Sequence, residues 1–224
     1  MRFHSRPIVY MVTDRQKFGG GDKSETELLN GVVEMARRAG KGNVDLIQVR
    51  ENDLADSALF GLVRRIISAV IGSRTRVLVN DRIDVAIAAG AAGVHLKENS
   101  VSAMRVRSVA PKGWIIGRSV HDVEEAKRVC ESGGLDYLLV GTVFRTESKP
   151  GLEPNGVGML STVCKSVQLP VLAIGGVNSS NARKIASTGA AGVAGIGMFG
   201  TKKRGSLQSD MLVTVGSIRD AFLN

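Results

Sequence analysis

The chain has 224 residues, of which 43% are hydrophobic, and 30 lysines and arginines against 21 acidic residues give a formal net charge of +9. This length suits one domain over residues 1–224 with a large core, because α/β barrels often exceed the usual single-domain length. The positive charge fits a protein that handles anionic small molecules; nucleic-acid binding is disfavoured, because aromatic residues make up only 4% and no basic–aromatic patch occurs.

The cysteines and the apolar runs indicate the cellular compartment in which the protein is expected. Cys130 and Cys164 fall in expected helices without a paired spacing, so we expect reduced thiols in a cytoplasmic protein. The first residues, MRFHSRPIVYMVTD, carry charge and no long apolar segment, which argues against a signal peptide. No run approaches membrane-spanning length, so no membrane partner is expected.

Short apolar runs alternate with helical patterns along the chain. The expected strands are residues 8–13, 44–49, 76–80, 93–96, 115–119, 137–140, 171–174 and 193–196. The expected helices are about 24–39, 56–70, 83–89, 102–109, 123–130, 157–166, 181–188 and 209–222. A capping box, Ser24 with Glu27, opens the first helix, and Gly40 is expected to end it. Residues 14–23, with three consecutive glycines, are expected to form a loop.

The sequence GAAGV occurs at 90–94 and again at 189–193, each time between a short helix and a short strand. The repeat supports a regular alternation of strand and helix. Eight strand–helix pairs without a dividing linker predict a parallel sheet covered by helices, and at this length a closed (β/α)₈ barrel. The alternative is an open doubly wound sheet. No GxGxxG fingerprint follows the first strand, which argues against a dinucleotide site.

In such a barrel the active site lies at the carboxyl ends of the strands, and a phosphate commonly binds the loops after strands seven and eight. Those loops are Gly175-Gly176 and 195–198, which read GIGM. Glycine lets backbone N–H groups approach a phosphate closely, and a helix N-terminus adds a favourable dipole, so we expect a phosphate site here. The alternative is that glycine merely eases the turns.

Polar side chains follow the other strands. They are Gln48, Arg50 and Glu51; Asn80, Asp81 and Arg82; Arg118, Ser119 and His121; and Arg145, Thr146, Glu147, Ser148 and Lys149. Arg50 could clamp an anion bidentately, and Lys149 could act as a point charge on a phosphate or a leaving group. Asn80 and Asp81 offer the hard oxygen donors that suit Mg²⁺. His95 and His121 are more often structural than acid–base groups at such positions.

Several segments of the chain resemble those of a known family. They are YMVTDR, QVRE, VNDRIDVAIAAGAAGVHL, IIGRSVHDVEEA, GTVFRTESKPG, and PVLAIGG with GAAGVAGI. Over nearly its whole length the chain resembles the thiamine phosphate synthase/TenI superfamily of (β/α)₈ barrels. The resemblance implies an enzyme of thiamine biosynthesis that binds a small phosphorylated substrate.

The synthase branch of this family joins hydroxymethylpyrimidine diphosphate to a thiazole phosphate and releases diphosphate with Mg²⁺. The resemblance assigns Gln48, Arg50 and Lys149 to the diphosphate substrate, Ser119 to its pyrimidine, Asp81 beside Asn80 to the metal, and Thr146, Ser148, Gly176, Ile196 and Gly197 to the thiazole phosphate. The chain departs from the synthase pattern in three places. Gly197 replaces a usual serine, Asn52 replaces the lysine of REK, and Ser100 replaces the second metal aspartate of HxGQED.

The segments IIGRSVHDVEEA and SKPGLEPNGVGML resemble those of the TenI branch, the thiazole tautomerases. The TenI branch also has a serine at the position of Ser100. A tautomerase moves a proton and needs an acid–base group but no diphosphate chemistry. The family's histidine of GHVF is Thr142 here, and a threonine hydroxyl is a poor general base.

The resemblance therefore favours a TenI-like tautomerase, with Arg50 and Lys149 as catalytic residues and Thr142 in the substrate site. The synthase is the first alternative, and Mg²⁺ is expected only for it. A non-catalytic barrel that binds thiazole phosphate is the second alternative. A homodimer is left open.

Overall fold

The computed structural model describes residues 7–19, 23–147, 151, 153–199 and 211–223. The strands in this part of the chain are β1 (Ile8–Val12), β2 (Leu46–Val49), β3 (Arg76–Asn80), β4 (Gly93–Leu96), β5 (Ile115–Val120), β6 (Tyr137–Val140), β7 (Val171–Ile174) and β8 (Gly192–Gly195). The helices are α1 (Arg15–Gly19), α2 (Glu25–Lys41), α3 (Asp56–Ala69), α4 (Ile83–Ala89), α5 (Ala103–Val109), α6 (Val123–Glu131), α7 (Gly156–Ser166), α8 (Ala182–Ala186) and α9 (Met211–Leu223).

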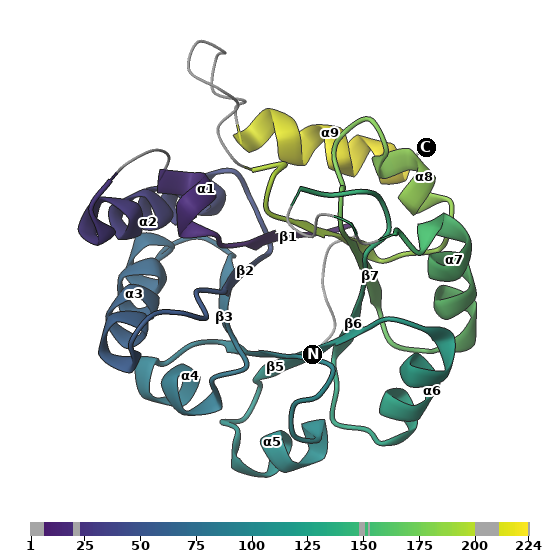
Figure 1. The fold of residues 1–224 in the computed structure, drawn as a ribbon, viewed down its shortest axis with the longest axis horizontal. Coiled ribbons are helices and arrows are strands. Elements are labelled where there is room, and N and C mark those ends of the chain that lie inside the picture. Colours follow the sequence, from purple (N-terminus) through teal and green to yellow (C-terminus); the bar gives the residue numbers. More distant parts are fainter. Residues whose placement is uncertain (1–6, 20–22, 148–150, 152, 200–210, 224) are drawn as a thin grey trace.

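The strands form a closed parallel barrel in chain order, with β8 paired back to β1. Tyr10 of β1 lies opposite Ala194 of β8 and opposite Leu46 of β2, so the ring has no open edge. Figure 1 looks into this ring and shows the helices around its outside. The predicted (β/α)₈ barrel is therefore confirmed, and the open doubly wound sheet is excluded.

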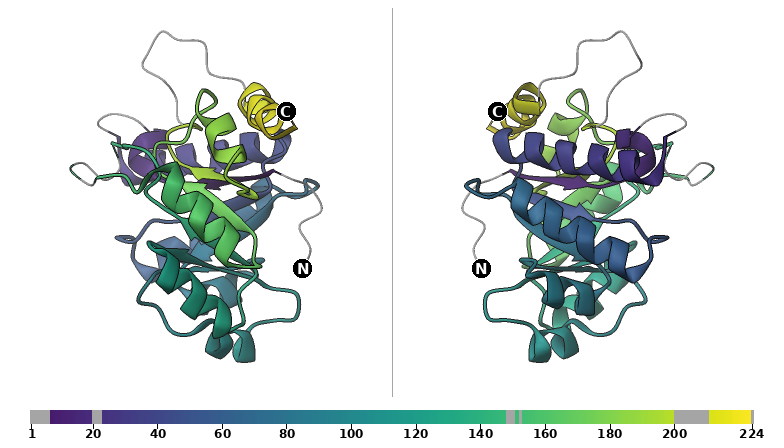
Figure 2. Two further views of the ribbon diagram at one scale, coloured as in Figure 1. Left: turned by 90° about the vertical axis from the view of Figure 1, so that its right-hand side faces the viewer. Right: turned by 90° about the vertical axis from the view of Figure 1, so that its left-hand side faces the viewer.

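Most residues of the strands are apolar because the barrel buries both faces of the sheet. In β1, Val9 and Met11 pack outward under the helices, whereas Ile8 and Tyr10 point into the barrel. The side views show the helices alongside the barrel, outside its strands (Figure 2). The inner core is filled by side chains, so the site is confined to the end of the barrel.

The helix ends agree in part with the sequence signals. Ser24 Oγ accepts the Glu27 N–H at 3.3 Å and the Ser24 N–H donates to Glu27 Oε2 at 3.0 Å, which confirms the capping box. Gly90 ends α4 in the left-handed conformation with φ of 74°. Gly40 does not end α2, because the helix continues to Lys41.

The largest differences from the prediction concern two segments. Residues 15–19, expected in a loop, form α1, where the Phe18 N–H donates to the Asp14 carbonyl at 3.0 Å. The second strand begins at Leu46 and not at residue 44, because the Val44 N–H still donates to the Ala39 carbonyl and so belongs to the turn that ends α2.

Both cysteines are free, half-buried thiols, Cys130 on α6 and Cys164 on α7, and burial raises the pKa of each. They therefore stay protonated near neutral pH. Within the described residues, no helix combines the length and the apolar character needed to cross a membrane.

Candidate active site

A cavity of about 1180 Å³ opens at the carboxyl ends of the strands. Ten of the residues expected in the site line it: Gln48, Arg50, Asn80, Ser119, Thr142, Thr146, Gly175, Gly176, Ile196 and Gly197. The barrel thus brings together side chains from distant parts of the chain at one end. Ser148 and Lys149 lie outside the described residues. Asp81 is not among the lining residues. The binding and catalytic roles of all these residues remain predictions.

A chain of hydrogen bonds crosses the floor of this cavity. Ser119 Oγ on β5 lies 2.9 Å from His95 Nε2 on β4, and His95 Nδ1 lies 2.9 Å from Tyr137 Oη on β6. Tyr137 Oη lies 3.0 Å from Tyr10 Oη on β1. Each of these strands contributes a side chain that points into the barrel, so residues up to 127 positions apart meet at the axis.

The chain of bonds continues from Tyr10 to the opposite wall. The Tyr10 hydroxyl donates to Gln48 Oε1 on β2 at 3.2 Å, and Gln48 Nε2 donates to Asn80 Oδ1 on β3 at 2.7 Å. Asn80 Nδ2 then donates to Asn52 Oδ1 at 3.0 Å. Asn52 is therefore the last residue of this hydrogen-bond network, and it occupies the position where the synthases that this chain resembles have a lysine.

The donors and acceptors give the network one direction. Because the single Tyr10 proton goes to Gln48, the Tyr10 oxygen accepts from Tyr137, and the Tyr137 oxygen accepts from the Nδ1–H of His95. His95 Nε2 then has no proton and accepts from the Ser119 hydroxyl. Ser119 thus presents its oxygen to the cavity as an acceptor for a substrate N–H group.

His95 is held neutral within this network. Its side chain is fully enclosed, and burial, opposed by the Asp81 charge, lowers its pKa to about 3 from an ordinary value of 6.5. A neutral imidazole with both nitrogens in hydrogen bonds orients Ser119 and Tyr137 and does not exchange protons with a substrate near neutral pH. The structural role expected for His95 agrees with this geometry.

The depressed pKa of His95 predicts acid sensitivity. Below pH 6.5 the unfolded chain protonates this histidine and the folded chain does not, so stability from this group is complete above pH 6.5 and falls progressively towards pH 3. Between pH 7 and pH 5 the free energy of unfolding should fall by about 2 kcal/mol through His95. Urea unfolding at both pH values measures the change. NMR titration of the imidazole checks its origin, because a His95 signal that titrates near pH 6.5 contradicts the assignment.

The two glycines after β7 are required by their surroundings. Gly175 and Gly176 have φ of 101° and 63°, in the left-handed region that favours glycine. A Cβ on Gly176 would overlap the Arg145 carbonyl oxygen, and one on Gly175 would meet Thr142 Cγ2. By contrast, a Cβ on Gly197 would meet nothing within 4 Å, so the serine usual in the synthases would fit there.

In the described part of the chain, no helix begins directly after Gly176 or after β8, so the helix dipole that was expected at the phosphate site is missing there. α8 has five residues and begins at Ala182, six positions beyond Gly176, and residues 196–199 form a turn and not a helix. The segment between Gly176 and α8 lines the cavity with Asn178, Ser179 and Ser180. No helix end therefore faces the cavity at Gly176, and the N–H groups of Asn178, Ser180 and Asn181 already donate to side-chain oxygens within the turn.

Several charged residues at the strand ends form ion pairs with other protein groups. Glu51 is buried, burial raises its pKa, and its Oε2 lies 3.2 Å from Arg15 Nη1. Arg82 pairs with Asp56 at 2.5 Å and with Asp84 at 2.6 Å outside the cavity. Sequence position alone did not separate these structural pairs from cavity residues.

Asp81, the expected metal ligand, is engaged by protein donors. It has φ of 62°, Ser100 Oγ donates to its Oδ1, and Lys97 Nζ lies 3.4 Å from its Oδ2. Among the described residues no group of three or more His, Cys, Asp and Glu side chains is placed to hold a metal ion. With both carboxylate oxygens already paired, the residues present do not fit a preformed Mg²⁺ site.

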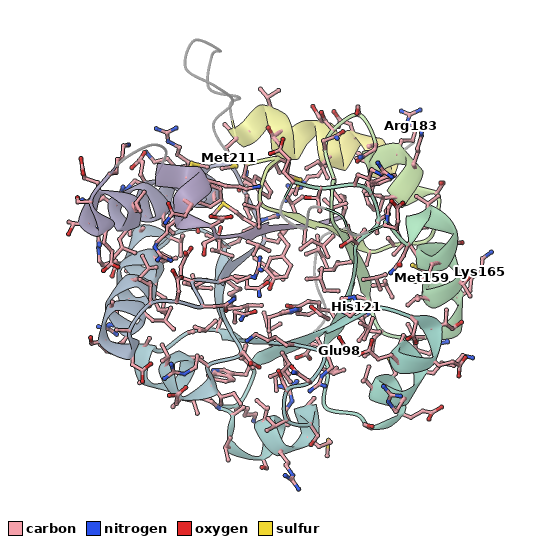
Figure 3. The ribbon with its side chains drawn as sticks, in the orientation of Figure 1. Glu98, His121, Met159, Lys165, Arg183 and Met211 are labelled. Atoms are coloured by element: carbon pink, nitrogen blue, oxygen red, sulfur yellow. The ribbon has the colours of Figure 1, made fainter. Side chains whose placement is uncertain are left out.

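His121 lies at the rim with its own partners. Its Nδ1 donates to the Gly141 carbonyl at 2.9 Å, and its Nε2 lies 3.6 Å from Glu98 Oε2. Figure 3 shows His121 and Glu98 close together at the barrel, whereas Lys165 and Arg183 point outward from α7 and α8. His121 is thus oriented by the backbone, and it is among the residues that line the cavity.

Sequence analysis missed two cationic residues that line the cavity, Lys17 on α1 and Lys97 directly after β4. Lys17 was overlooked because its segment was expected to be a loop and not the helix α1. Lys97 follows a strand immediately, and the rule that active-site residues follow barrel strands would have identified it.

Comparison with known proteins agrees with this geometry. Residues 9–199 match the family described as thiamine monophosphate synthase (TMP-TENI). The thiamine-phosphate synthase of Coprothermobacter proteolyticus is 39% identical over 181 residues, 80% of this chain and 85% of that protein. The thiamine-phosphate synthase of Roseiflexus sp. is 35% identical over 188 residues, 84% of this chain and 75% of that protein.

A solved structure shows the same similarity in three dimensions. The thiamine phosphate pyrophosphorylase from Pyrococcus furiosus superposes with a TM-score of 0.77 at 30% sequence identity, covering 97% of this chain and 96% of that chain. The family match covers most of the chain, from Val9 in β1 to the cavity turns that follow β7 and β8. The chain therefore belongs to the thiamine monophosphate synthase (TMP-TENI) family.

Proposed function

We propose that this chain is a thiamine-phosphate synthase, which joins hydroxymethylpyrimidine diphosphate to thiazole phosphate and releases diphosphate. The relatives reported above are named for this reaction. They favour the synthase, the alternative of the sequence analysis, over the TenI-like tautomerase that was its first expectation. The geometry supports the same choice, because the tautomerase position holds the buried, weakly basic hydroxyl of Thr142.

The cavity has the space and the polarity for two substrates. Its volume of about 1180 Å³ exceeds the roughly 300–1,000 Å³ of a pocket for one drug-sized ligand. We place the pyrimidine over the neutral floor of Gln48, Asn80 and Ser119, where the network fixes donors and acceptors. The thiazole phosphate lies against the turns at Gly175-Gly176 and 196–197, with Thr146 beside them.

The proposed reaction needs stabilisation of a leaving group more than it needs a protein nucleophile. The thiazole nitrogen forms a C–N bond with the pyrimidine methylene carbon, and the C–O bond to diphosphate breaks with its electron pair leaving on the diphosphate. Positive groups at the developing charge lower the barrier. Arg50, exposed at the cavity rim, is the residue that we assign to this role, together with Lys149.

The single observation that carries this proposal is one cavity that joins the neutral hydrogen-bonded floor to the glycine turns and to the Arg50 guanidinium. Its test is the formation of thiamine phosphate from the two substrates, followed by liquid chromatography. We expect steady turnover. Tight binding of thiazole phosphate, seen as a raised melting temperature, without any product would support the non-catalytic alternative instead.

A further inference from the structure

Lys97 places a positive charge beside the carboxylate that was expected to bind a metal. It is the first residue after β4, it lines the cavity, and 49% of its side chain is exposed. Its Nζ lies 3.4 Å from Asp81 Oδ2, and Ser100 Oγ donates to the other carboxylate oxygen. An ammonium and a hydroxyl thus bracket Asp81 where a divalent cation would need open oxygens.

The loop that carries Lys97 is held in place by its own turn and by β5. The Lys97 N–H donates to Ser100 Oγ at 2.8 Å, and the Ser100 N–H donates back to the Lys97 carbonyl at 3.3 Å. Arg118, only 7% exposed, donates to the carbonyls of Glu98 at 2.9 Å, Ser100 at 3.1 Å and Val101. The backbone of Lys97 is therefore fixed, while its long side chain can reach from Asp81 into the cavity.

A cation beside Asp81 would offset the charge of its carboxylate when an anion binds in the cavity. A diphosphate close to the Asp81 carboxylate would be repelled unless a positive charge lay between them. Asn52 supplies none, because it is uncharged and its amide oxygen accepts from Asn80. Lysine is a compact, mobile point charge that suits phosphate oxygens.

We propose that the Lys97 ammonium is the counter-ion of the diphosphate in this chain, seated between Asp81 and the leaving group in the place of a divalent metal. This proposal deepens the proposed synthase function and rests on it. When the C–O bond breaks and its electron pair leaves on the diphosphate, Lys97 stays protonated and balances the charge without donating a proton.

The test is calorimetric titration of the full chain with inorganic pyrophosphate in EDTA. The wild type should bind, and the Lys97→Ala variant should bind about 10- to 100-fold more weakly, as expected for loss of a charged hydrogen bond. Lys112 is an exposed lysine just before β5, at the opposite end of the barrel, so Lys112→Ala is the matched control and should bind like the wild type. Excess MgCl₂ should not tighten wild-type binding.

Two further variants separate the charge from the fold. Lys97→Arg should retain pyrophosphate binding in EDTA, because it keeps the cation. Ser100→Asp should weaken binding in EDTA and gain strength when MgCl₂ is added, because a second carboxylate then faces Asp81. Circular dichroism confirms that each variant is folded before titration.

Two results would overturn the proposal: pyrophosphate binding by the wild type only in the presence of Mg²⁺, or equal binding by the wild type and Lys97→Ala. These outcomes are distinct from failure of the proposed function. If no thiamine phosphate is made but Lys97→Ala loses pyrophosphate, the anion site stands and the synthase assignment fails. If thiamine phosphate is made while Lys97→Ala binds normally, only the role of Lys97 fails.

Discussion

Replacing Arg50 by alanine is expected to lower kcat/KM for thiamine phosphate formation by about 10²- to 10³-fold, the usual cost of removing one group that stabilises developing negative charge. Arg50 follows β2 and lines the cavity beside the neutral floor. Its backbone N–H donates to Thr13 Oγ1 at 2.9 Å, and this bond fixes the backbone from which the Arg50 side chain extends. Steady-state kinetics with varied pyrimidine diphosphate measures the change.

The control for this prediction is Arg183→Ala, which removes the same charge from α8, where the side chain points outward (Figure 3). It should leave kcat/KM unchanged. Arg50→Lys should recover only part of the activity, because lysine cannot reproduce the bidentate contact. Unchanged kinetics for Arg50→Ala would remove Arg50 from the reaction and leave leaving-group stabilisation to other cations.

Replacing Gly117 by alanine is expected to destabilise the barrel by about 3–5 kcal/mol, through overpacking and loss of buried hydrogen bonds. Gly117 lies on β5 inside the barrel, and an added Cβ would overlap the ring and hydroxyl of Tyr137. The ring must then move, which breaks the Tyr137 bonds to His95 and Tyr10. Urea unfolding followed by circular dichroism measures the loss.

A second glycine serves as the matched control. Gly61 lies within α3, and an added Cβ there would meet nothing within 4 Å. Gly61→Ala should stabilise the protein by about 0.5–1 kcal/mol, because alanine is the better helix former. Equal effects at the two positions, in either direction, would show that the Tyr137 ring does not fill the space over Gly117.

The sequence predicted the barrel well because its signals are local and repeated. The apolar runs that became β3, β4, β6 and β7 were bounded correctly to the residue, since charged or glycine-rich turns flank each of them. The rule that active-site residues follow barrel strands also predicted that Gln48, Asn80 and Ser119 lie at one site with the glycine turns, and all of them line the cavity. The five-residue helix α1 was missed because so short a segment has no periodicity to detect.

The hydrogen-bond network could not be predicted from local patterns. Tyr10 and Tyr137 are 127 residues apart and meet only because closure of the barrel aims both rings at its axis. Asp81 illustrates the same limit for charge. Its position after β3 predicted a metal ligand, yet the loop after β4 folds Ser100 and Lys97 onto its carboxylate.

The most direct test of the proposed synthase function is to assay one preparation of the protein separately with two sets of substrates. The first contains hydroxymethylpyrimidine diphosphate and thiazole phosphate, with and without MgCl₂, and the second contains the thiazole carboxylate phosphate tautomer alone. We predict steady formation of thiamine phosphate from the first set and no conversion of the second. Conversion of the tautomer without any thiamine phosphate would contradict the synthase assignment and make the chain a tautomerase.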